Sequence, residues 1–462
     1  MNKFVGRKNE LTMLENAYGS SKSEFIPVYG RRRIGKSELI LHFIEKKPSI
    51  YLLGKKSTPQ LQIREFLDIL SNTYSQPLIA NSRVDNWKEA LELIVKHKKT
   101  DKKMVVVFDE FQWLAETSPD LISILQEFID TEWKKRKDIM LIICGSYMGF
   151  MEKEILGEKS PLFGRRTAQI LLKPFNYKDA ADFFPSWSYK DKAKAYFVCG
   201  GVPFYLLFFS ENKSIFKNIE ENFFSEFSAL YREADFLLKE ELRELQKYYA
   251  ILTSLAAGSL TYFDISKVTG IEEKKLYYYI EQLIALGYVR RRYPLLTQRH
   301  SSKNVRFIID DALLKFWFRF VYPNTAYIPQ VNAKDAFQNL VKPYIDSYFG
   351  TCFENLCREA LAGAYLTEGI YGDFEIGEYW DKCLQIDVVG HRKKEGIDIC
   401  ECKWTGIKST NKLVNELRSK IRKYPNDDNL TIQGRIFSRE TIKEHKKFPE
   451  IRFYSLEDIY LL

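Results

Sequence analysis

Short runs of apolar residues alternate with amphipathic segments from the start of the chain to residue 172. Three of these runs, Phe25–Tyr29, Met104–Phe108 and Ile139–Cys144, are apolar at every position. Such runs are typical of strands that are buried on both faces of a parallel sheet. The segments between them predict helices that cover the sheet. The pattern therefore predicts an α/β domain over residues 1–172.

A glycine loop follows the first apolar run and leads into a helix expected from Lys36 to Glu45. Its spacing, G-x-x-x-x-G-K-S, is that of a P-loop, in which backbone N–H groups and the helix N-terminus cradle phosphates. We expect Lys36 to reach the β- and γ-phosphates of ATP and Ser37 to ligate Mg²⁺. The residues predicted to bind the nucleotide are Gly30, Arg31, Arg32, Arg33, Ile34, Gly35, Lys36 and Ser37. Two interpretations of the three arginines are open. They contact phosphates or a neighbouring domain, or they are solvated charges.

Polar residues follow the other two apolar runs. Asp109 and Glu110 end the second run, and we expect Asp109 to hold Mg²⁺ through water and Glu110 to orient or deprotonate the attacking water. Ser146 follows the third run and either senses the γ-phosphate or caps a helix. Arg165 and Arg166 follow a Pro/Gly loop and either neutralise charge in the transition state or form surface ion pairs.

The middle of the chain has a helical pattern. Residues 173–240 are expected to form a small helical lid on the nucleotide, with a break at Gly200–Pro203. Residues 241–325 predict three helices and a β-hairpin, with a polar turn at Arg299 to Lys303, which together make a winged helix-turn-helix. Its basic residues, including Arg290–Arg292, either contact DNA or belong to a regulatory lever.

A second polar constellation lies in the last quarter of the chain, where a domain is expected over residues 333–462. The runs Leu384–Val389 and Ile397–Lys403 predict two strands, and folding the chain back about residue 394 places Asp387 close to Glu401. Glu401 and Lys403 are two residues apart and share a face of their strand. Two carboxylates and a lysine suit Mg²⁺-assisted phosphodiester hydrolysis, and the alternative is an ordinary exposed hairpin.

Composition adds little to these patterns. The chain of 462 residues has a formal net charge of +9, which mildly favours a polyanionic partner such as nucleic acid. No apolar stretch is long enough to cross a membrane or to act as a signal peptide. The seven cysteines have no framework spacing and indicate reduced thiols of a cytoplasmic protein, with a zinc site near Cys400 and Cys402 as the alternative.

Five motifs in the first half resemble the archaeal-type AAA+ ATPases, a family that lies near the signal-transducing STAND branch. They are Phe4-Val5-Gly6-Arg7 with Glu10-Leu11, the loop Gly30–Ser37, Phe108–Gln112, Ser160–Arg166 and Gly200–Pro203. The resemblance implies that Gly6 and Arg7 lie near the adenine or the ribose of ATP.

The segment from about residue 316 to Leu462 resembles the PD-(D/E)xK nuclease-like domain that is commonly fused to these ATPases. Asp387 and the Glu401-Cys402-Lys403 triplet match its signature, although Ile386 stands in place of the usual proline. The resemblance implies an active site in which Glu354, Asp387 and Glu401 hold Mg²⁺ and Lys403 positions or activates water.

Two functions from different classes compete. The first is an ATP-hydrolysing enzyme that acts on DNA and cuts it at the C-terminal site. The second is a STAND-like switch in which the nucleotide state controls a protein partner or a dormant effector, without DNA cleavage. A regulator that binds DNA without cutting it is a third, and the sequence leaves open whether the protein forms a homo-oligomer.

Overall fold

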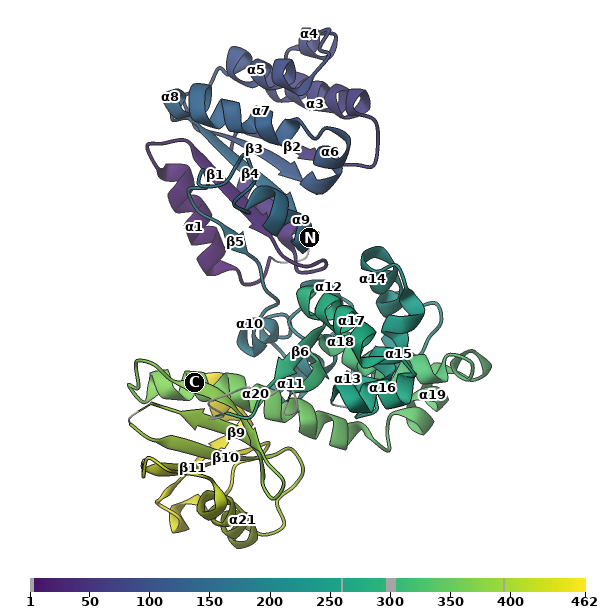
Figure 1. The fold of residues 1–462 in the computed structure, drawn as a ribbon, viewed down its shortest axis with the longest axis vertical. Helices are drawn as coiled ribbons and strands as arrows, with labels where there is room; N and C mark the ends of the chain where they lie inside the picture. The colour runs from purple at the N-terminus through teal and green to yellow at the C-terminus, as the bar shows by residue number, and fades with distance from the viewer. Residues whose placement is uncertain (1–3, 259–260, 296–304, 394) are drawn as a thin grey trace. The chain divides into compact units, whose positions relative to one another are not determined.

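The computed structural model describes residues 4–258, 261–295, 305–393 and 395–462. These residues form two compact units: the chain up to Pro174 together with Val202–Phe204, and the segments Phe175–Gly201 and Tyr205–Leu462 (Figure 1). The predicted polar turn at Arg299 to Lys303 lies outside the described residues.

The first unit is built on a parallel sheet of five strands in the order β2-β3-β4-β1-β5. The strands are β1 (Glu24–Tyr29), β2 (Ser49–Leu53), β3 (Met104–Asp109), β4 (Ile139–Gly145) and β5 (Ile170–Leu171). Every residue of β1, β3 and β4 is buried, which explains why their sequences are continuously apolar. This sheet confirms the α/β fold predicted for the first part of the chain.

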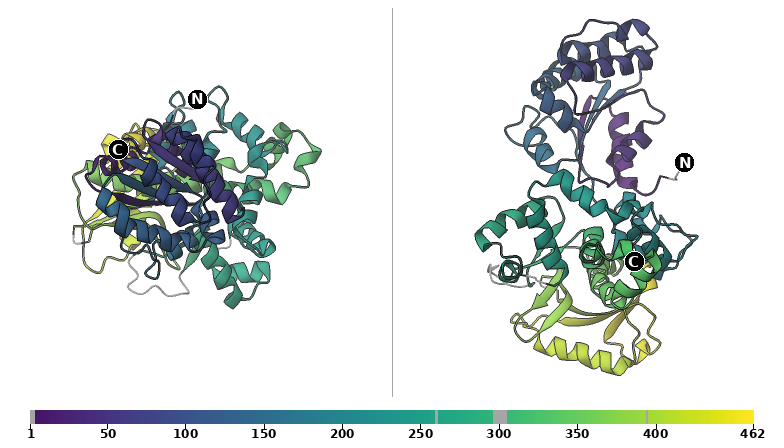
Figure 2. Two further views of the ribbon diagram at one scale, coloured as in Figure 1. Left: turned by 90° about the horizontal axis from the view of Figure 1, so that it is seen from above. Right: turned by 90° about the vertical axis from the view of Figure 1, so that its right-hand side faces the viewer.

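Helices cover both faces of this sheet, as Figures 1 and 2 show. In β3, Val105 and Val107 point into the core that α1 and α2 share, whereas Val106 and Phe108 point into the core beneath α3, α5 and α7. The helices of this unit are α1 (Lys8–Gly19), α2 (Lys36–Ile44), α3 (Pro59–Tyr74), α4 (Pro77–Ala80), α5 (Trp87–His97), α6 (Phe111–Thr117), α7 (Leu121–Phe128), α8 (Lys134–Arg136) and α9 (Met148–Phe150).

The second unit begins with the helices that the sequence predicts as a lid. They are α10 (Tyr177–Ala181), α11 (Tyr189–Cys199), α13 (Ile215–Phe223) and α14 (Glu233–Glu241), whereas α12 (Pro203–Leu206) begins in the first unit and ends in the second. The rings of Phe197 in α11 and Phe349 in α20 (Ile345–Thr367) lie 5.7 Å apart. The Tyr177 hydroxyl donates to the Ile459 carbonyl at 2.9 Å. These contacts place the expected lid helices in one core with the C-terminal domain, a grouping that the helical pattern alone did not indicate.

Three helices and a two-stranded antiparallel ladder follow. They are α15 (Leu245–Ala256), α16 (Tyr262–Thr269), α17 (Glu273–Ala285), β6 (Val289–Arg292) and β7 (Arg306–Ile309). Of the three adjacent tyrosines on α17, Tyr277 and Tyr278 are exposed, and Tyr279 is buried against Tyr248. The helices α18 (Ala312–Phe316) and α19 (Ala333–Leu340) lead to α20.

The C-terminal part of the second unit has its own mixed sheet, in the order β12-β11-β10-β9-β8. Its elements are β8 (Glu375–Trp380), β9 (Gln385–His391), β10 (Ile397–Lys403), α21 (Thr410–Lys423), β11 (Ile432–Ser438), β12 (Ile451–Ser455) and α22 (Leu456–Leu461). Strands β8, β9 and β10 are antiparallel neighbours, and β10, β11 and β12 run parallel. Helices α20 and α21 lie on opposite faces of this sheet (Figure 1).

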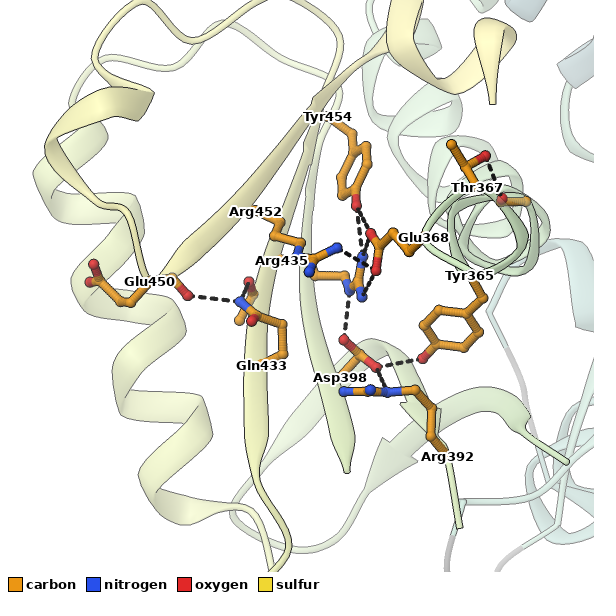
Figure 3. Close-up of polar contacts among 12 residues, drawn as sticks. Tyr365, Thr367, Glu368, Arg392, Asp398, Gln433, Arg435, Glu450, Arg452 and Tyr454 are labelled. Carbon is orange, nitrogen blue, oxygen red and sulfur yellow. Dashed lines mark hydrogen bonds and ion pairs between the residues drawn. The ribbon is translucent and has the colours of Figure 1, made fainter. Parts of the chain in front are cut away.

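A buried network of charges lies between α20 and the sheet (Figure 3). Arg435 of β11 donates from Nε to Asp398 at 2.6 Å and from Nη1 and Nη2 to Glu368 at 2.6 and 2.9 Å. Asp398 is fully buried and also accepts from Arg392 and from the Tyr365 hydroxyl, each at 2.7 Å. Each buried carboxylate therefore has a cationic partner and further hydrogen bonds, as a charge removed from water requires.

Candidate functional site

The loop between β1 and α2 has the backbone of a phosphate cradle. Gly30 has a φ of +151°, and a Cβ there would lie 2.4 Å from the Leu172 carbonyl oxygen. Gly35 has a φ of +83° and is the N-cap residue of α2. Only glycine adopts both conformations without strain, so these two positions explain the glycine spacing of the motif.

Lys36 is buried in the first turn of α2, and its Nζ donates to the Arg31 carbonyl at 2.9 Å. Burial lowers the pKa of this ammonium group, and the nearby Glu110 and Asp109 carboxylates oppose that shift. The loop therefore holds a buried cation close to two acids.

Asp109 ends β3 and is fully buried. One of its carboxylate oxygens accepts from the Tyr51 hydroxyl at 2.6 Å, and the other accepts from the Glu110 backbone N–H at 2.8 Å. Burial, followed by the Asp109 charge, raises the pKa of the Tyr51 phenol far above its usual range. Sequence reasoning missed Tyr51 because it acts across the sheet, from the neighbouring strand β2.

Glu110 has a left-handed backbone with a φ of +47°. Its carboxylate accepts from the Ser146 hydroxyl at 2.7 Å and from the side-chain amide of Gln112. The structure thus brings Lys36, Asp109, Glu110 and Ser146 to the same edge of the sheet. Gln112 belongs to the motif Phe108–Gln112 of the family resemblance, but its contact with Glu110 was not predicted.

The predicted arginines have different surroundings. Arg7 follows Gly6 (φ +68°) and donates to the carbonyl of the P-loop residue Ile34 at 3.1 Å. Arg165 binds Asp130 through two nitrogens at 2.8 to 3.0 Å. Arg166 is exposed.

The P-loop arginines Arg31, Arg32 and Arg33 are all partly buried. The Arg33 guanidinium lies over the Phe204 ring, 4.4 Å from its centroid. The N-terminal motif and the segment Val202–Phe204 therefore both contact the P-loop.

The second candidate site lies where α20, β9 and β10 meet. The β9–β10 ladder pairs Val388 with Cys400, so one further step along both strands sets Asp387 opposite Glu401. Glu354 of α20 is partly buried, and burial followed by the Asp387 charge raises its pKa to about 7. Burial would lower the pKa of Lys403, but the hydrogen bond to Glu401 raises it, and the Asp387 charge adds to this rise. Asp387 is therefore an electrostatic neighbour of both Glu354 and Lys403.

Glu401 is buried and paired with two lysines. Its carboxylate contacts Lys403 Nζ at 2.8 Å and Lys420 Nζ of α21 at 2.7 Å. Burial would raise the pKa of Glu401, but these lysines lower it. Within the residues that the structure describes, no group of three or more His, Cys, Asp or Glu side chains has the geometry to hold a metal ion. The contact of Lys420 with Glu401 was not predicted from the sequence.

Two family models match the chain. Residues 4–209 match an ATPase domain found predominantly in Archaea, and residues 317–414 match a family of archaeal and bacterial proteins of unknown function. An uncharacterised protein of Methanocaldococcus jannaschii is 29% identical over 92% of this chain and 93% of its own length. An uncharacterised ATP-binding protein of Pyrococcus abyssi is 30% identical over 29% of this chain and 39% of its own length.

Solved structures of similar fold include a Walker-type ATPase of Pyrococcus abyssi, with a TM-score of 0.53 at 19% identity, over 68% of this chain and 96% of that one. The family match, the parallel sheet and the P-loop together define the first unit as an ATP-binding ATPase domain of the P-loop class. No helix in the described ranges is long and apolar enough to cross a membrane.

Proposed function

We propose that the protein hydrolyses ATP at the P-loop and uses the second unit to bind DNA and cleave its phosphodiester backbone with Mg²⁺. One observation carries the cleavage proposal. Glu354 on a helix, Asp387 on a strand and the Glu401–Lys403 pair on the next strand lie around one end of a mixed sheet. This is the set that the PD-(D/E)xK resemblance implies.

The residues of the first unit fit ATP and Mg²⁺. A Cβ at Gly30 would lie 2.4 Å from the Leu172 carbonyl oxygen, so the loop backbone depends on glycine there, and the buried Lys36 ammonium lies close to Asp109 and Glu110. The Ser37 hydroxyl and the Asp109 carboxylate are the oxygen ligands that Mg²⁺ prefers. Bound Mg²⁺ would neutralise charge on the phosphate oxygens.

Each residue of this first site then has a role in hydrolysis. Lys36 holds the β- and γ-phosphates, as the lysine of a P-loop does. Glu110 orients the attacking water and accepts its proton at a carboxylate oxygen. Ser146 donates to Glu110 and fixes its direction. Gln112 donates to the same carboxylate, so two side chains hold it in place.

The carboxylates of Asp387, Glu401 and Glu354 offer the oxygen ligands that a hard cation prefers, but within the described structure they do not form a group with the geometry to hold a metal ion. Asp387 and Glu401 would hold Mg²⁺ with help from Glu354, and the metal would polarise the scissile phosphate and lower the pKa of bound water. The ion pair with Glu401 keeps the Lys403 side chain positively charged. In this proposal the Lys403 ammonium group positions the attacking water. Lys420 contacts the same Glu401 carboxylate as Lys403.

The direct test is cleavage of supercoiled plasmid DNA by the full chain with Mg²⁺ and ATP. We expect Lys403→Ala to lower the cleavage rate at least ~100-fold, since the loss of one electrostatic group in an active site typically costs that much. Lys408→Ala removes an exposed lysine five residues away and should cut as the wild type does. Equal cutting by wild type and Lys403→Ala would remove the nuclease assignment.

The ATPase half is tested separately by ATP turnover. Lys36→Ala should abolish nucleotide binding because it removes the buried cation of the cradle. Lys46→Ala, an exposed lysine just after α2, is the matched control. Unchanged ATP turnover in Lys36→Ala would contradict the role given to the P-loop.

A nucleotide-controlled switch without DNA cleavage is the second candidate. The observation that favours it is the neutralisation of Glu401 by both Lys403 and Lys420, which leaves the carboxylate engaged within the chain. This candidate predicts slow ATP turnover and a change of oligomeric state between ATP and ADP, measured by size-exclusion chromatography with light scattering. Strong stimulation of ATP turnover by DNA would count against it.

A further inference from the structure

A cavity of about 470 Å³ lies inside the second unit, between the β6–β7 ladder and α20. Its walls come from the end of α15, from β6 and β7, from the segment after Asp311, and from α20. The charged side chains that line it are Arg292, Arg306, Lys315, Arg319, Arg358 and Glu354. A volume of this size accommodates a ligand as large as a nucleotide.

The lining carries more positive charge than the protein neutralises. Arg292 is paired with Glu378. Arg306 stacks over the Trp380 ring at 4.4 Å, and Lys315 contacts the Cys352 sulfur at 3.5 Å.

In the part of the chain that the structure describes, the other two cations, Arg358 and Arg319, do not form an ion pair with a carboxylate either. Arg358 donates to the Asp387 carbonyl and to Asn355 rather than to a carboxylate. Arg319 is exposed. Across the described residues, Arg292 is the one cation of this set that forms an ion pair with a carboxylate.

Crowding of these cations is costly in the absence of an anion. Burial and then the Arg358 charge lower the pKa of Arg292 to about 9, and burial lowers the pKa of Arg306 and Arg358 as well. A phosphate in the cavity would offset this repulsion. Guanidinium groups bind phosphate oxygens through two parallel hydrogen bonds, so an arginine-rich lining suits this anion better than a lysine-rich one.

The cavity also adjoins the candidate cleavage site. Glu354 lines it, and Gln385, another lining residue, donates to the Asp387 carboxylate at 3.4 Å. Arg358 binds the Asp387 backbone. The exposed Tyr344 ring at the cavity offers a surface on which a base can stack. A nucleic-acid strand with one phosphate in the cavity would present a neighbouring phosphodiester to Asp387.

We propose that this cavity binds a phosphate of a nucleic-acid strand and sets its position relative to the cleavage site, an inference that rests on the proposed function. Arg319 and Arg358 contact the phosphate from the α18–α20 side. Arg306 contacts it from the β6–β7 ladder. The ladder of the predicted winged helix is then part of the substrate-binding surface of the nuclease-like domain.

Binding is measured with the full chain carrying Lys36→Ala, so that nucleotides do not bind at the P-loop. The probe is a fluorescent single-stranded oligonucleotide with a 5′-phosphate, followed by anisotropy in EDTA over a series of salt concentrations. We expect Arg319→Ala and Arg306→Ala each to weaken binding about tenfold and to reduce the slope of log K against log salt by about 1. Arg243→Ala removes an exposed arginine outside the cavity and should bind as the parent does.

Two competitors distinguish the sources of the phosphate. An unlabelled oligonucleotide should displace the probe at a concentration at least about tenfold below that of a mononucleotide, because a strand makes further backbone contacts. Displacement by the mononucleotide at equal concentration would overturn the assignment to a strand. Thermal unfolding midpoints equal to that of the parent show that the variants are folded.

The outcomes separate the cavity from the cleavage proposal. If the cavity variants bind weakly and the wild type cuts no DNA, the cavity assignment stands and the cleavage proposal fails. If the wild type cuts DNA, and Arg319→Ala and Arg306→Ala bind and cut as it does, cleavage stands and the cavity assignment is overturned.

Discussion

Replacement of Arg435 by methionine tests the reasoning about buried charge most directly. Methionine keeps much of the apolar stem of arginine but removes three hydrogen bonds to two carboxylates, at 2.6, 2.6 and 2.9 Å (Figure 3). Asp398 is fully buried, so it cannot recover these bonds from water. Removal of one partner from a buried ion pair costs about 3–5 kcal/mol.

The loss of stability in Arg435→Met should lie at the lower end of this range, because both carboxylates keep other partners. Asp398 keeps Arg392 and the Tyr365 hydroxyl, and Glu368 keeps Arg452 and the Tyr454 hydroxyl. We therefore expect a loss of about 3 kcal/mol in the stability of the C-terminal sheet, which is about a hundredfold in its opening equilibrium. Arg452→Ala removes a half-exposed partner of the same Glu368 and should cost less than about 1 kcal/mol.

Amide hydrogen exchange by mass spectrometry measures this change in peptides of β10 and β11, separately from the first unit. Exchange in Arg435→Met should be faster by about two orders of magnitude, whereas peptides of β1 and β3 should exchange as in the wild type. Exchange within threefold of wild type in β10 and β11, or an equal effect of Arg452→Ala, would refute the argument.

Three further predictions concern the nucleotide site and acid stability. Glu110→Gln should lower ATP turnover at least ~100-fold while nucleotide affinity stays within about threefold, and Glu116→Gln on α6 should change neither value. Gly30→Ala should abolish nucleotide binding in a calorimetric titration, because its Cβ would lie 2.4 Å from the Leu172 carbonyl oxygen. Burial would raise the pKa of Glu368, but Arg435 and Tyr454 lower it from 4.5 to about 2. Its stabilisation is therefore complete above pH 4.5 and is lost toward pH 2, so the unfolding midpoint of Glu368→Gln should fall less than that of wild type in this window.

Local patterns were enough to predict much of the fold. The apolar runs at Phe25, Met104 and Ile139 are strands because every position in them is buried, and this signal does not depend on distant residues. The loop Gly30–Ser37 was predictable for the same reason, since the local backbone conformation requires glycine at Gly30 and Gly35. The hairpin of β9 and β10 was found from two apolar runs and a polar turn.

Contacts between distant segments could not be predicted in this way. Tyr51 meets Asp109 because β2 and β3 are neighbours in the sheet, an order that no local pattern specifies. Asp398 lies in the predicted strand Ile397–Lys403, but no local pattern indicated that its carboxylate is buried against Arg435, which is 37 residues away. The packing of Phe197 on α20 likewise depends on tertiary contact rather than on helical period.

The segment Val202–Phe204 has a practical consequence for any attempt to divide the protein. Its flanking residues belong to the second unit, yet the Phe204 ring lies under the Arg33 guanidinium and its N–H donates to the Arg33 carbonyl at 3.4 Å. A fragment that stops at Pro174 would retain the whole parallel sheet but lose the contacts between Phe204 and Arg33 of the P-loop. The ATPase domain is therefore discontinuous in sequence, and no single cut of the chain isolates it intact.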